Sequence, residues 1–368
     1  MVRRRFVYGL WLTLLAILWF FENNAGTRAA LLISILLPLL SVLAARFASR
    51  RARAVLVCPE TLRKGEEVPC VLRLSASLSW LYGTHAKLRC CNGLTGEAAD
   101  LSLHGTGKQA AAILSSECCG LLHLEAGTAL TDWLGLCRFQ VAGVKAAEAC
   151  VQPELLPVRL GAEGQERLTA DGLSAAVPRP NGGEGELRDY IPGDPPARIH
   201  WKLSAKADRL LTRQEEAWPA ENILLLLETA RRNASPAEVS RTAEGLLSLS
   251  WTLVSESLPH TVLWPEKGSM RRLSVSEAAD WEALRAALLR AETTVDGPGA
   301  CRLAADTYPE LSGARVFVFS PTPETDAVSL AQSNAVTLIL PGEASSGAVR
   351  TIHLGDELDL EEALSWQD

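Results

Sequence analysis

Two long apolar runs lie near the start of the chain, separated by a short connector at residues 22–28. Residues 6–21 contain no charged side chain. As a helix they would measure about 24 Å, somewhat short of a bilayer core of about 30 Å. Residues 29–48 supply the roughly 20 residues that a span requires, with a proline at position 38 as a site for a kink. No other segment approaches this apolar length, so we predict a two-helix transmembrane hairpin over residues 1–53.

Arginines on either side of the hairpin predict its orientation. Residues 3–5 are all arginine and four more follow the second run, at positions 46, 50, 51 and 53, whereas only Arg28 lies in the connector. The positive-inside rule then places both termini and the rest of the chain in the cytoplasm. The alternatives are a cleaved export signal, because RRRFV loosely resembles a twin-arginine start, and a buried helical hairpin. A second apolar run directly behind the first argues against cleavage.

Short apolar stretches separated by turn-forming residues follow, without helical periodicity. They lie at 54–58, 68–74, 86–90 and 121–124. This pattern predicts an antiparallel β-sandwich over residues 54–145, a fold that usually presents loops or edges to partners. Residues 146–220 are rich in Pro, Gly and short charged stretches, so we expect a linker there that also carries a distinctive charged motif.

The pattern changes again at residue 221 and predicts an α/β domain over 221–368. The run 222–228 (NILLLLE) is typical of a strand buried on both faces, and Ser235, Pro236 and Glu238 are typical of the start of a helix over 235–254. Strands at 260–264, 314–319 and 336–340 and helices at 276–291 and 325–332 continue the alternation. We therefore expect a mostly parallel, doubly wound (Rossmann-like) sheet, and an α+β multidomain protein as a whole.

Charge is unevenly distributed along the chain. Residues 1–53 hold eight arginines and one acid, a charge of +7, and the remainder holds 28 basic and 42 acidic residues, a charge of −14. An acidic body is repelled by phosphate backbones, which makes nucleic acid a poor partner. The nine cysteines are odd in number and lack the paired spacing of a zinc site, so we expect reduced thiols, in agreement with a cytoplasmic location.

The segment 182–216 is the most distinctive part of the sequence. Unlike charges and aromatic side chains crowd around Pro192-Gly193 and Pro195-Pro196, which favour a rigid turn. The candidate functional residues are Glu184, Arg188, Asp189, Tyr190, Gly193, Asp194, Arg198, His200, Trp201, Lys202 and Ser204.

This segment has two interpretations. One is acid/base catalysis, with His200 as the base and Asp189 or Asp194 orienting it. The other is a salt-bridged clasp or partner-binding surface, in which Arg188 and Arg198 pair with neighbouring acids. The sequence contains no nucleophile elbow, no phosphate-binding Gly loop and no paired metal ligands, which favours the second interpretation.

The same segment resembles the signature of the bacterial domain-of-unknown-function family 58. The pattern G-x-E-x-x-x-L-R-x-Y-x-x-G-D-x-x-R-x-I-x-W-x-x-S-A is approximated from Gly182 to Ala205. Residues 131–137 (TDWLGLC) and 151–158 (VQPELLPV) are similar to two further family segments, although Trp133 stands at the usual proline and Cys137 at the usual aromatic residue. The resemblance implies a membrane protein that accompanies a MoxR-type AAA+ ATPase and has a C-terminal domain similar to a von Willebrand factor A domain.

Von Willebrand A domains often bind Mg²⁺ through D-x-S-x-S after the first strand. The corresponding residues here are Glu228, Thr229, Ala230, Arg231 and Arg232. Ala230 offers no side-chain oxygen and the two arginines add positive charge, so we expect a degenerate site at Glu228 and Thr229 that holds no metal.

We predict neither cofactor nor enzymatic activity, but a membrane-anchored scaffold that acts with the ATPase in assembly or maturation of client proteins. An enzyme using Asp189, Asp194 and His200, or a metal-dependent adhesion module, is the alternative. The oligomeric state stays open.

Overall fold

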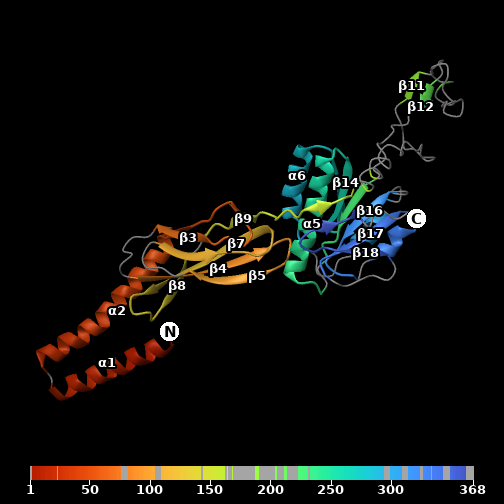
Figure 1. The fold of residues 1–368 in the computed structure, drawn as a ribbon. Helices are drawn as coiled ribbons and strands as arrows, with labels where there is room; N and C mark the ends of the chain where they lie inside the picture. The colour runs from red at the N-terminus through yellow and green to blue at the C-terminus, as the bar shows by residue number, and fades with distance from the viewer. Residues whose placement is uncertain are drawn as a thin grey trace. The chain divides into compact units, whose positions relative to one another are not determined.

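The computed structural model describes residues 2–22, 24–75, 82–103, 109–141, 144–161, 164, 168, 187–189, 204, 211–213, 223–230, 233–293, 299–308, 314–323, 326–332, 334–342 and 349–361. The chain is a mixed α and β protein that begins with two apolar helices and continues through several sheets (Figure 1). It divides into two compact units. Unit 1 is Met1–Leu155, Arg231–Glu244 and Arg285–Asp296, and unit 2 is Leu156–Ala230, Gly245–Leu284 and Gly297–Asp368.

The N-terminal hairpin consists of α1 (Val2–Glu22) and α2 (Ala25–Arg51). The side chain of Asn24 caps α2 by accepting from the N–H of Gly26, and the Tyr8 hydroxyl donates to the carbonyl of Ser34 on the neighbouring helix. Both helices are long and apolar enough to cross a membrane, and only 6% and 17% of their most apolar windows are buried. This exposure differs from that of a soluble protein's core helix. The length and composition that we predicted for two spans are therefore present.

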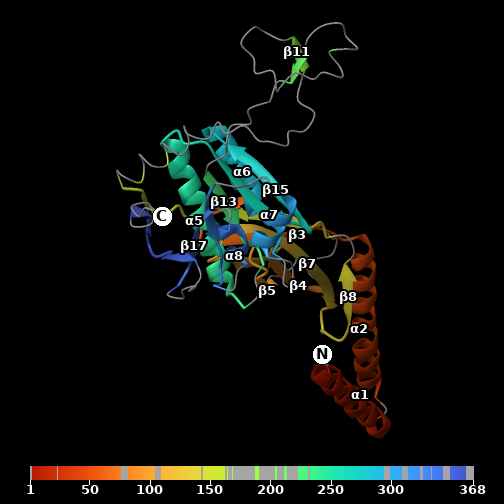
Figure 2. The ribbon, with the colours of Figure 1, turned by 90° about the vertical axis from the view of Figure 1, so that its right-hand side faces the viewer.

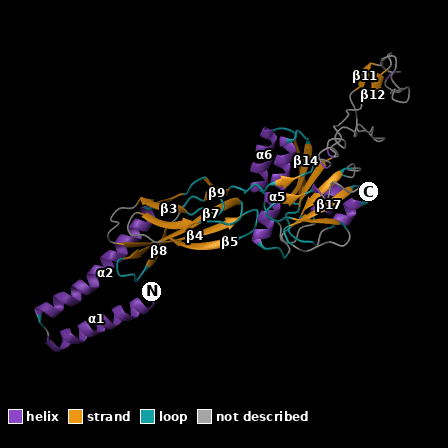
Figure 3. Ribbon diagram, viewed as in Figure 1, coloured by secondary structure: helices purple, strands orange, loops and turns teal. Residues whose placement is uncertain are grey.

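Two sheets form a β-sandwich in unit 1 (Figure 3). The smaller sheet has the order β1 (Arg53–Val57), β3 (Val68–Ser75), β6 (Gln109–Leu114). The larger sheet has the order β2 (Thr61–Leu62), β9 (Ala147–Val151), β7 (Gly120–Asp132), β4 (Tyr82–Asn92), β5 (Ala98–Leu103). A further strand, β8 (Arg138–Val141), pairs with β7. Inward residues of both sheets, such as Leu72, Leu88 and Leu124, share one core. The predicted strands are confirmed, and β9 extends this core past residue 145.

The cysteines are not all reduced thiols. Cys58 and Cys70 form a disulfide with a Cα–Cα distance of 4.7 Å. The antiparallel register pairs Val57 with Val71, which brings the next residues, Cys58 and Cys70, opposite each other. The expectation of nine reduced thiols is therefore wrong for this pair, because strand pairing decides which cysteines meet and their spacing in sequence does not. The other seven cysteines form no disulfide.

The last turns of α2 pack onto the sandwich. Ser41, Ala45 and Ala48 are buried at helical spacing, and both alanines belong to the sandwich core. Figures 1 and 2 both show β8 beside this part of α2. The apolar run 29–48 thus combines a stretch exposed on the helix surface with turns that pack against protein.

Unit 2 contains a six-stranded sheet whose order is β15 (Ser269–Val275), β14 (His260–Glu266), β13 (Ile223–Leu227), β16 (Arg315–Phe319), β17 (Ala335–Leu340), β18 (Arg350–His353). All neighbouring strands are parallel except β14 and β15. β13 is buried at every position, as expected for a strand covered on both faces. The predicted strand and helix alternation is confirmed, and the order reverses between β13 and β16, which makes that position a topological switch point.

Helices cover the two faces of this sheet. The helices are α5 (Pro236–Ser255), α6 (Ala278–Leu289), α7 (Ala300–Thr307) and α8 (Ala327–Ala331). Ala300, Ala304 and Leu330 of α7 and α8 share a core with Leu224 and Leu226. On the other face, Gly245 of α5 lies so close to Phe319 that an added Cβ would be 3.4 Å from the ring. The remaining described strands form two short two-stranded sheets. β10 (Val158–Arg159) pairs with β19 (Leu358–Asp359), and β11 (Leu187–Asp189) pairs with β12 (Leu211–Arg213).

Candidate functional sites

Most of the charged motif lies outside the described residues. Arg188 and Asp189 are in β11, where they pair in register with Thr212 and Leu211, and Ser204 is buried. Glu184, Tyr190, Gly193, Asp194, Arg198, His200, Trp201 and Lys202 are outside the described part of the chain, as are Arg231 and Arg232. The clasp and the acid/base interpretations of this motif both stay predictions.

The switch point of the sheet holds a buried carboxylate, that of Glu228. Its Oε1 accepts from the backbone N–H of Ala230 at 2.9 Å, and its Oε2 accepts from the N–H of Ala300 at 2.7 Å. Ala300 is the first residue of α7, so the carboxylate lies at a helix N-terminus, where a negative charge is stabilised. The N–H of Glu228 also donates to Phe319, which ties the ends of β13 and β16 together.

A neighbouring hydroxyl at this edge, that of Ser320, is bonded within the protein. The Ser320 hydroxyl donates to the carbonyl of Thr322 at 2.7 Å and accepts from the N–H of Thr322 at 3.3 Å. Thr229 is buried beside Glu228, and Ala230 has no side-chain oxygen. Among the residues that the structure describes, no three His, Cys, Asp or Glu side chains are grouped as metal ligands. The donor set at the switch point therefore does not fit a Mg²⁺ site, which needs several free oxygens.

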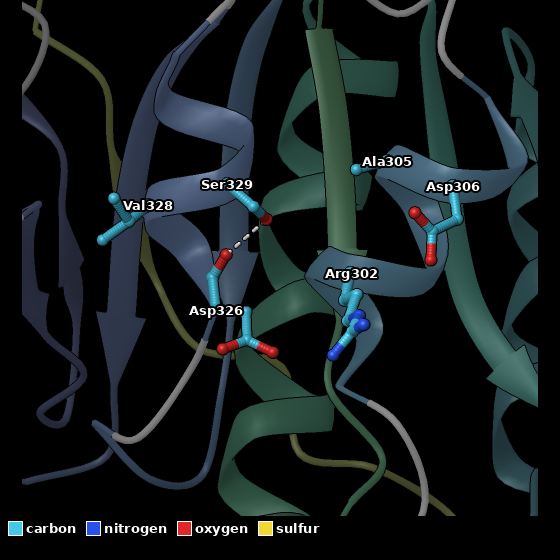
Figure 4. Close-up of a pocket in the computed structure, with 6 residues that line it drawn as sticks. All are labelled: Arg302, Ala305, Asp306, Asp326, Val328 and Ser329. Carbon is cyan, nitrogen blue, oxygen red and sulfur yellow. Dashed lines mark hydrogen bonds between the residues drawn. The ribbon is translucent and has the colours of Figure 1, made fainter.

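A hollow of about 380 Å³ lies between α7 and the start of α8 (Figure 4). Its charged lining consists of Arg302 and Asp306 from α7 and Asp326 just before α8, all exposed. The Ser329 hydroxyl donates to the backbone carbonyl of Asp326 at 2.6 Å. Among the described residues that line this hollow, no nucleophile is paired with a base, and the charged groups present are suited to polar contacts with solvent or a ligand.

Ser250 and His260 form a hydroxyl and imidazole pair inside unit 2. The Ser250 Oγ and His260 Nε2 atoms are 2.7 Å apart, and His260 Nδ1 lies 3.1 Å from the carbonyl of Leu258. Nδ1 must donate to that carbonyl, so Nε2 is the acceptor and the hydroxyl is the donor. His260 is 2% exposed, and burial lowers its pKa to about 4. The geometry is that of a nucleophile and its base, but no substrate can reach it, so the pair is structural.

The buried thiols of the sandwich are not nucleophiles. Burial raises the pKa of Cys90 and Cys118 to about 11 and that of Cys119 to about 12. All three therefore remain protonated at neutral pH, whereas a reactive cysteine requires its thiolate. The N–H of Cys119 donates to the hydroxyl of Ser240 at 2.9 Å, which is a packing role.

A buried ion pair joins separate segments of unit 1. The fully buried carboxylate of Glu244 lies 3.1 Å from the ammonium group of Lys64, and the guanidinium of Arg241 is 3.9 Å from its other oxygen. The side chain of Arg285 donates to Gln152 at 3.0 Å in the same unit. Sequence reasoning did not identify this cluster or the Ser250 and His260 pair, because partners that are ten or 180 residues apart leave no local signal.

Comparison with known proteins yields little. No protein-family model matches the chain. A stretch of 94 residues is 32% identical to the uncharacterized protein YeaD of Bacillus subtilis (strain 168), and the match covers 25% of this chain and 24% of YeaD. The chain thus aligns with about a quarter of that relative's length.

Among solved structures, the CARDB domain of the PF1109 protein from Pyrococcus furiosus, crystallised in complex with di-metal ions, matches 27% of this chain and 86% of its own. The TM-score is 0.17 and the identity is 10%, values too low to assign a fold or a ligand.

Proposed function

We propose that this protein is a membrane-anchored interaction protein, with both termini and the folded units in the cytoplasm. The observation that carries the proposal is the course of α2, which is exposed and apolar in its first half and enters the sandwich core through Ala45 and Ala48. A helix that belongs to both environments fixes the soluble fold to the bilayer. The arginines at both outer ends of the hairpin support the orientation.

The orientation is tested by adding protease to intact protoplasts. We expect residues 54–368 to resist digestion until the membrane is permeabilised, because a cytoplasmic body is shielded. Digestion in intact protoplasts would reverse the orientation. The disulfide between Cys58 and Cys70 makes this test necessary, since such bonds are usual in oxidising compartments.

The α/β part of the chain is proposed to be a von Willebrand A-like domain without its metal. Support comes from the strand order β15-β14-β13-β16-β17-β18 with one antiparallel edge pair, and from the motif resemblance. At the position where such a domain binds Mg²⁺, the Glu228 carboxylate accepts from two backbone N–H groups instead. Calorimetry of the full chain with Mg²⁺ should detect no saturable binding. Micromolar binding that is lost in Glu228→Ala would contradict this.

The proposed partner is a MoxR-type AAA+ ATPase, and the support is the family resemblance of residues 182–205. The proposed contact residues include Arg188, Asp194, Arg198 and Trp201. Detergent-solubilised protein should co-purify with an AAA+ ATPase from the same cell in a nucleotide-dependent way. Arg188→Ala should abolish the association, because an arginine forms paired contacts that alanine cannot replace. Arg271→Ala, an exposed arginine on β15, should not.

The enzyme alternative gives a different result in the same preparation. If no ATPase is recovered, and His200→Ala removes an activity while the fold is unchanged, the scaffold proposal fails. The cluster of Asp189, Asp194 and His200 would then be the site to investigate.

A further inference from the structure

The turn between β7 and β8, residues 133–137, lies against both N-terminal helices (Figures 1 and 2). The N–H of Trp133 donates to the hydroxyl of Ser41 in α2 at 2.9 Å. The guanidinium of Arg5 in α1 donates to the carbonyl of Leu136 at 2.7 Å, and Arg4 lies directly over Gly135. These contacts place the turn level with the start of α1 and with the middle of α2.

That level corresponds to the surface of a bilayer that contains the hairpin. The apolar part of α1 begins at Phe6, and the arginines just before it mark the headgroup layer, where guanidinium groups remain hydrated. The ten residues of α2 that follow Ser41 add about 15 Å, and they lie outside the apolar layer beside the sandwich. The β7–β8 turn therefore lies among the lipid headgroups.

The turn exposes one large apolar side chain at this level. Trp133 is 63% exposed. On α2, Leu43 lies about 3 Å further along the helix than Ser41 and is 56% exposed, on the face opposite the buried Ala45. Tryptophan combines an apolar body with an N–H donor, and it is enriched where apolar core and headgroups meet.

The turn is held rigidly and is flanked by cations. The carboxylate of Asp132 accepts from the N–H of Cys137 at 2.5 Å, and Gly135 adopts the left-handed conformation (φ 71°) that closes the turn. The exposed guanidinium of Arg138 follows at the start of β8, and that of Arg46 lies 5.8 Å from the ring of Phe139. Together with Arg4 and Arg5, these groups are suited to lipid phosphates.

We propose that the β7–β8 turn is a second membrane contact of this protein. Trp133 inserts its indole into the interface of a bilayer containing anionic phospholipid, and the surrounding arginines bind the phosphates. The proposal rests on the proposed membrane insertion of α1 and α2. It adds that the sandwich is held on the bilayer surface and does not swing freely above it.

The test uses photo-crosslinking in the full-length protein. A benzophenone amino acid replaces Trp133 in one variant, and the protein is reconstituted into vesicles of phosphatidylethanolamine and radiolabelled phosphatidylglycerol. Replacement at Trp251, also a partly exposed tryptophan but on α5 in unit 2, is the matched control. Replacement at Trp11, exposed on α1, reports insertion of the hairpin itself.

We expect a phospholipid adduct at positions 11 and 133 and none at position 251. An adduct at 11 without one at 133 overturns the surface contact and leaves the hairpin standing. An adduct at neither position overturns the insertion on which the proposal rests. A protein adduct at 133 in whole membranes, without lipid, shows that this surface binds a protein, and also overturns the proposal.

Discussion

Glu228 and His260 show how single buried polar residues of this chain are accommodated. Glu228 accepts from two backbone N–H groups, and His260 has a hydroxyl donor on one ring nitrogen and a carbonyl acceptor on the other. Both therefore avoid the penalty of an unpaired polar group in the interior. Glutamate can ligate a metal and histidine can act as a general base, and only the partners and burial of Glu228 and His260 assign them structural roles.

The low pKa of His260 makes stability depend on pH. In the folded protein the imidazole stays neutral down to about pH 4, whereas in the unfolded chain it takes up a proton at its ordinary value of 6.5. The unfolded state therefore binds more protons between these values, and stability falls as the pH drops through this window, by up to about 3 kcal/mol. Between about pH 7 and pH 4.5, the free energy of unfolding measured by denaturation should fall less for His260→Gln than for the wild type, because glutamine does not titrate. An equal loss in both proteins would contradict this.

Replacing Glu228 should destabilise unit 2. In Glu228→Gln one acceptor oxygen becomes an NH₂ group that faces a backbone N–H, at a cost of about 1–3 kcal/mol. The denaturant midpoint of the full chain in detergent measures this loss. Glu277→Gln, at an exposed position just before α6, should change the midpoint less. A midpoint unchanged in Glu228→Gln would show that the two N–H contacts contribute little.

At the scale of elements, apolar patterning predicted those with a continuous or periodic apolar signal. The run NILLLLE became β13, and the predicted helix start at Ser235 became α5. Several elements were not predicted, and β15 and α7 are two of them. β15 (SMRRLSV) is an edge strand that buries only Met270 and Val275, and α7 is short and has Gly299 at its N-cap, which provides no side-chain cap. β15 forms because it pairs with β14, and α7 forms because it packs on the core of the sheet. A local sequence pattern does not show such tertiary contacts.

The start of α5 is a capping box that can be removed by one mutation. The Ser235 hydroxyl accepts from the N–H of Glu238 at 3.3 Å, and the Glu238 carboxylate accepts from the N–H of Ser235 at 2.7 Å. Ser235→Ala should cost about 1 kcal/mol and speed hydrogen exchange in the first turn of α5. Ser269→Ala, at the exposed first residue of β15, is the control. Equal exchange in both variants would argue that Pro236 alone fixes the start of the helix.

At the scale of the whole molecule, sequence predicted the order of the parts better than their function. The hairpin, sandwich and α/β sheet follow from apolar length and period, which are properties of each segment. The candidate functional motif depends on which side chains meet, and of its eleven residues only Arg188, Asp189 and Ser204 are described. The disulfide is a similar case, because it follows from strand register. Membrane anchoring is thus supported by the fold, whereas the ATPase partner is proposed from resemblance.

The junction between α2 and the sandwich decides whether the hairpin and unit 1 move together. Ala48 is buried in the sandwich core, so Ala48→Leu adds volume where none is available, at a cost of about 1–3 kcal/mol. Ala29→Leu makes the same change at an exposed position of α2 and should be tolerated. Trypsin should therefore cleave Ala48→Leu faster at Arg51 or Arg53, the exposed arginines just beyond the junction. If both variants are cleaved at the wild-type rate, the helix end is not held by the core, and the hairpin would act as a flexible tether.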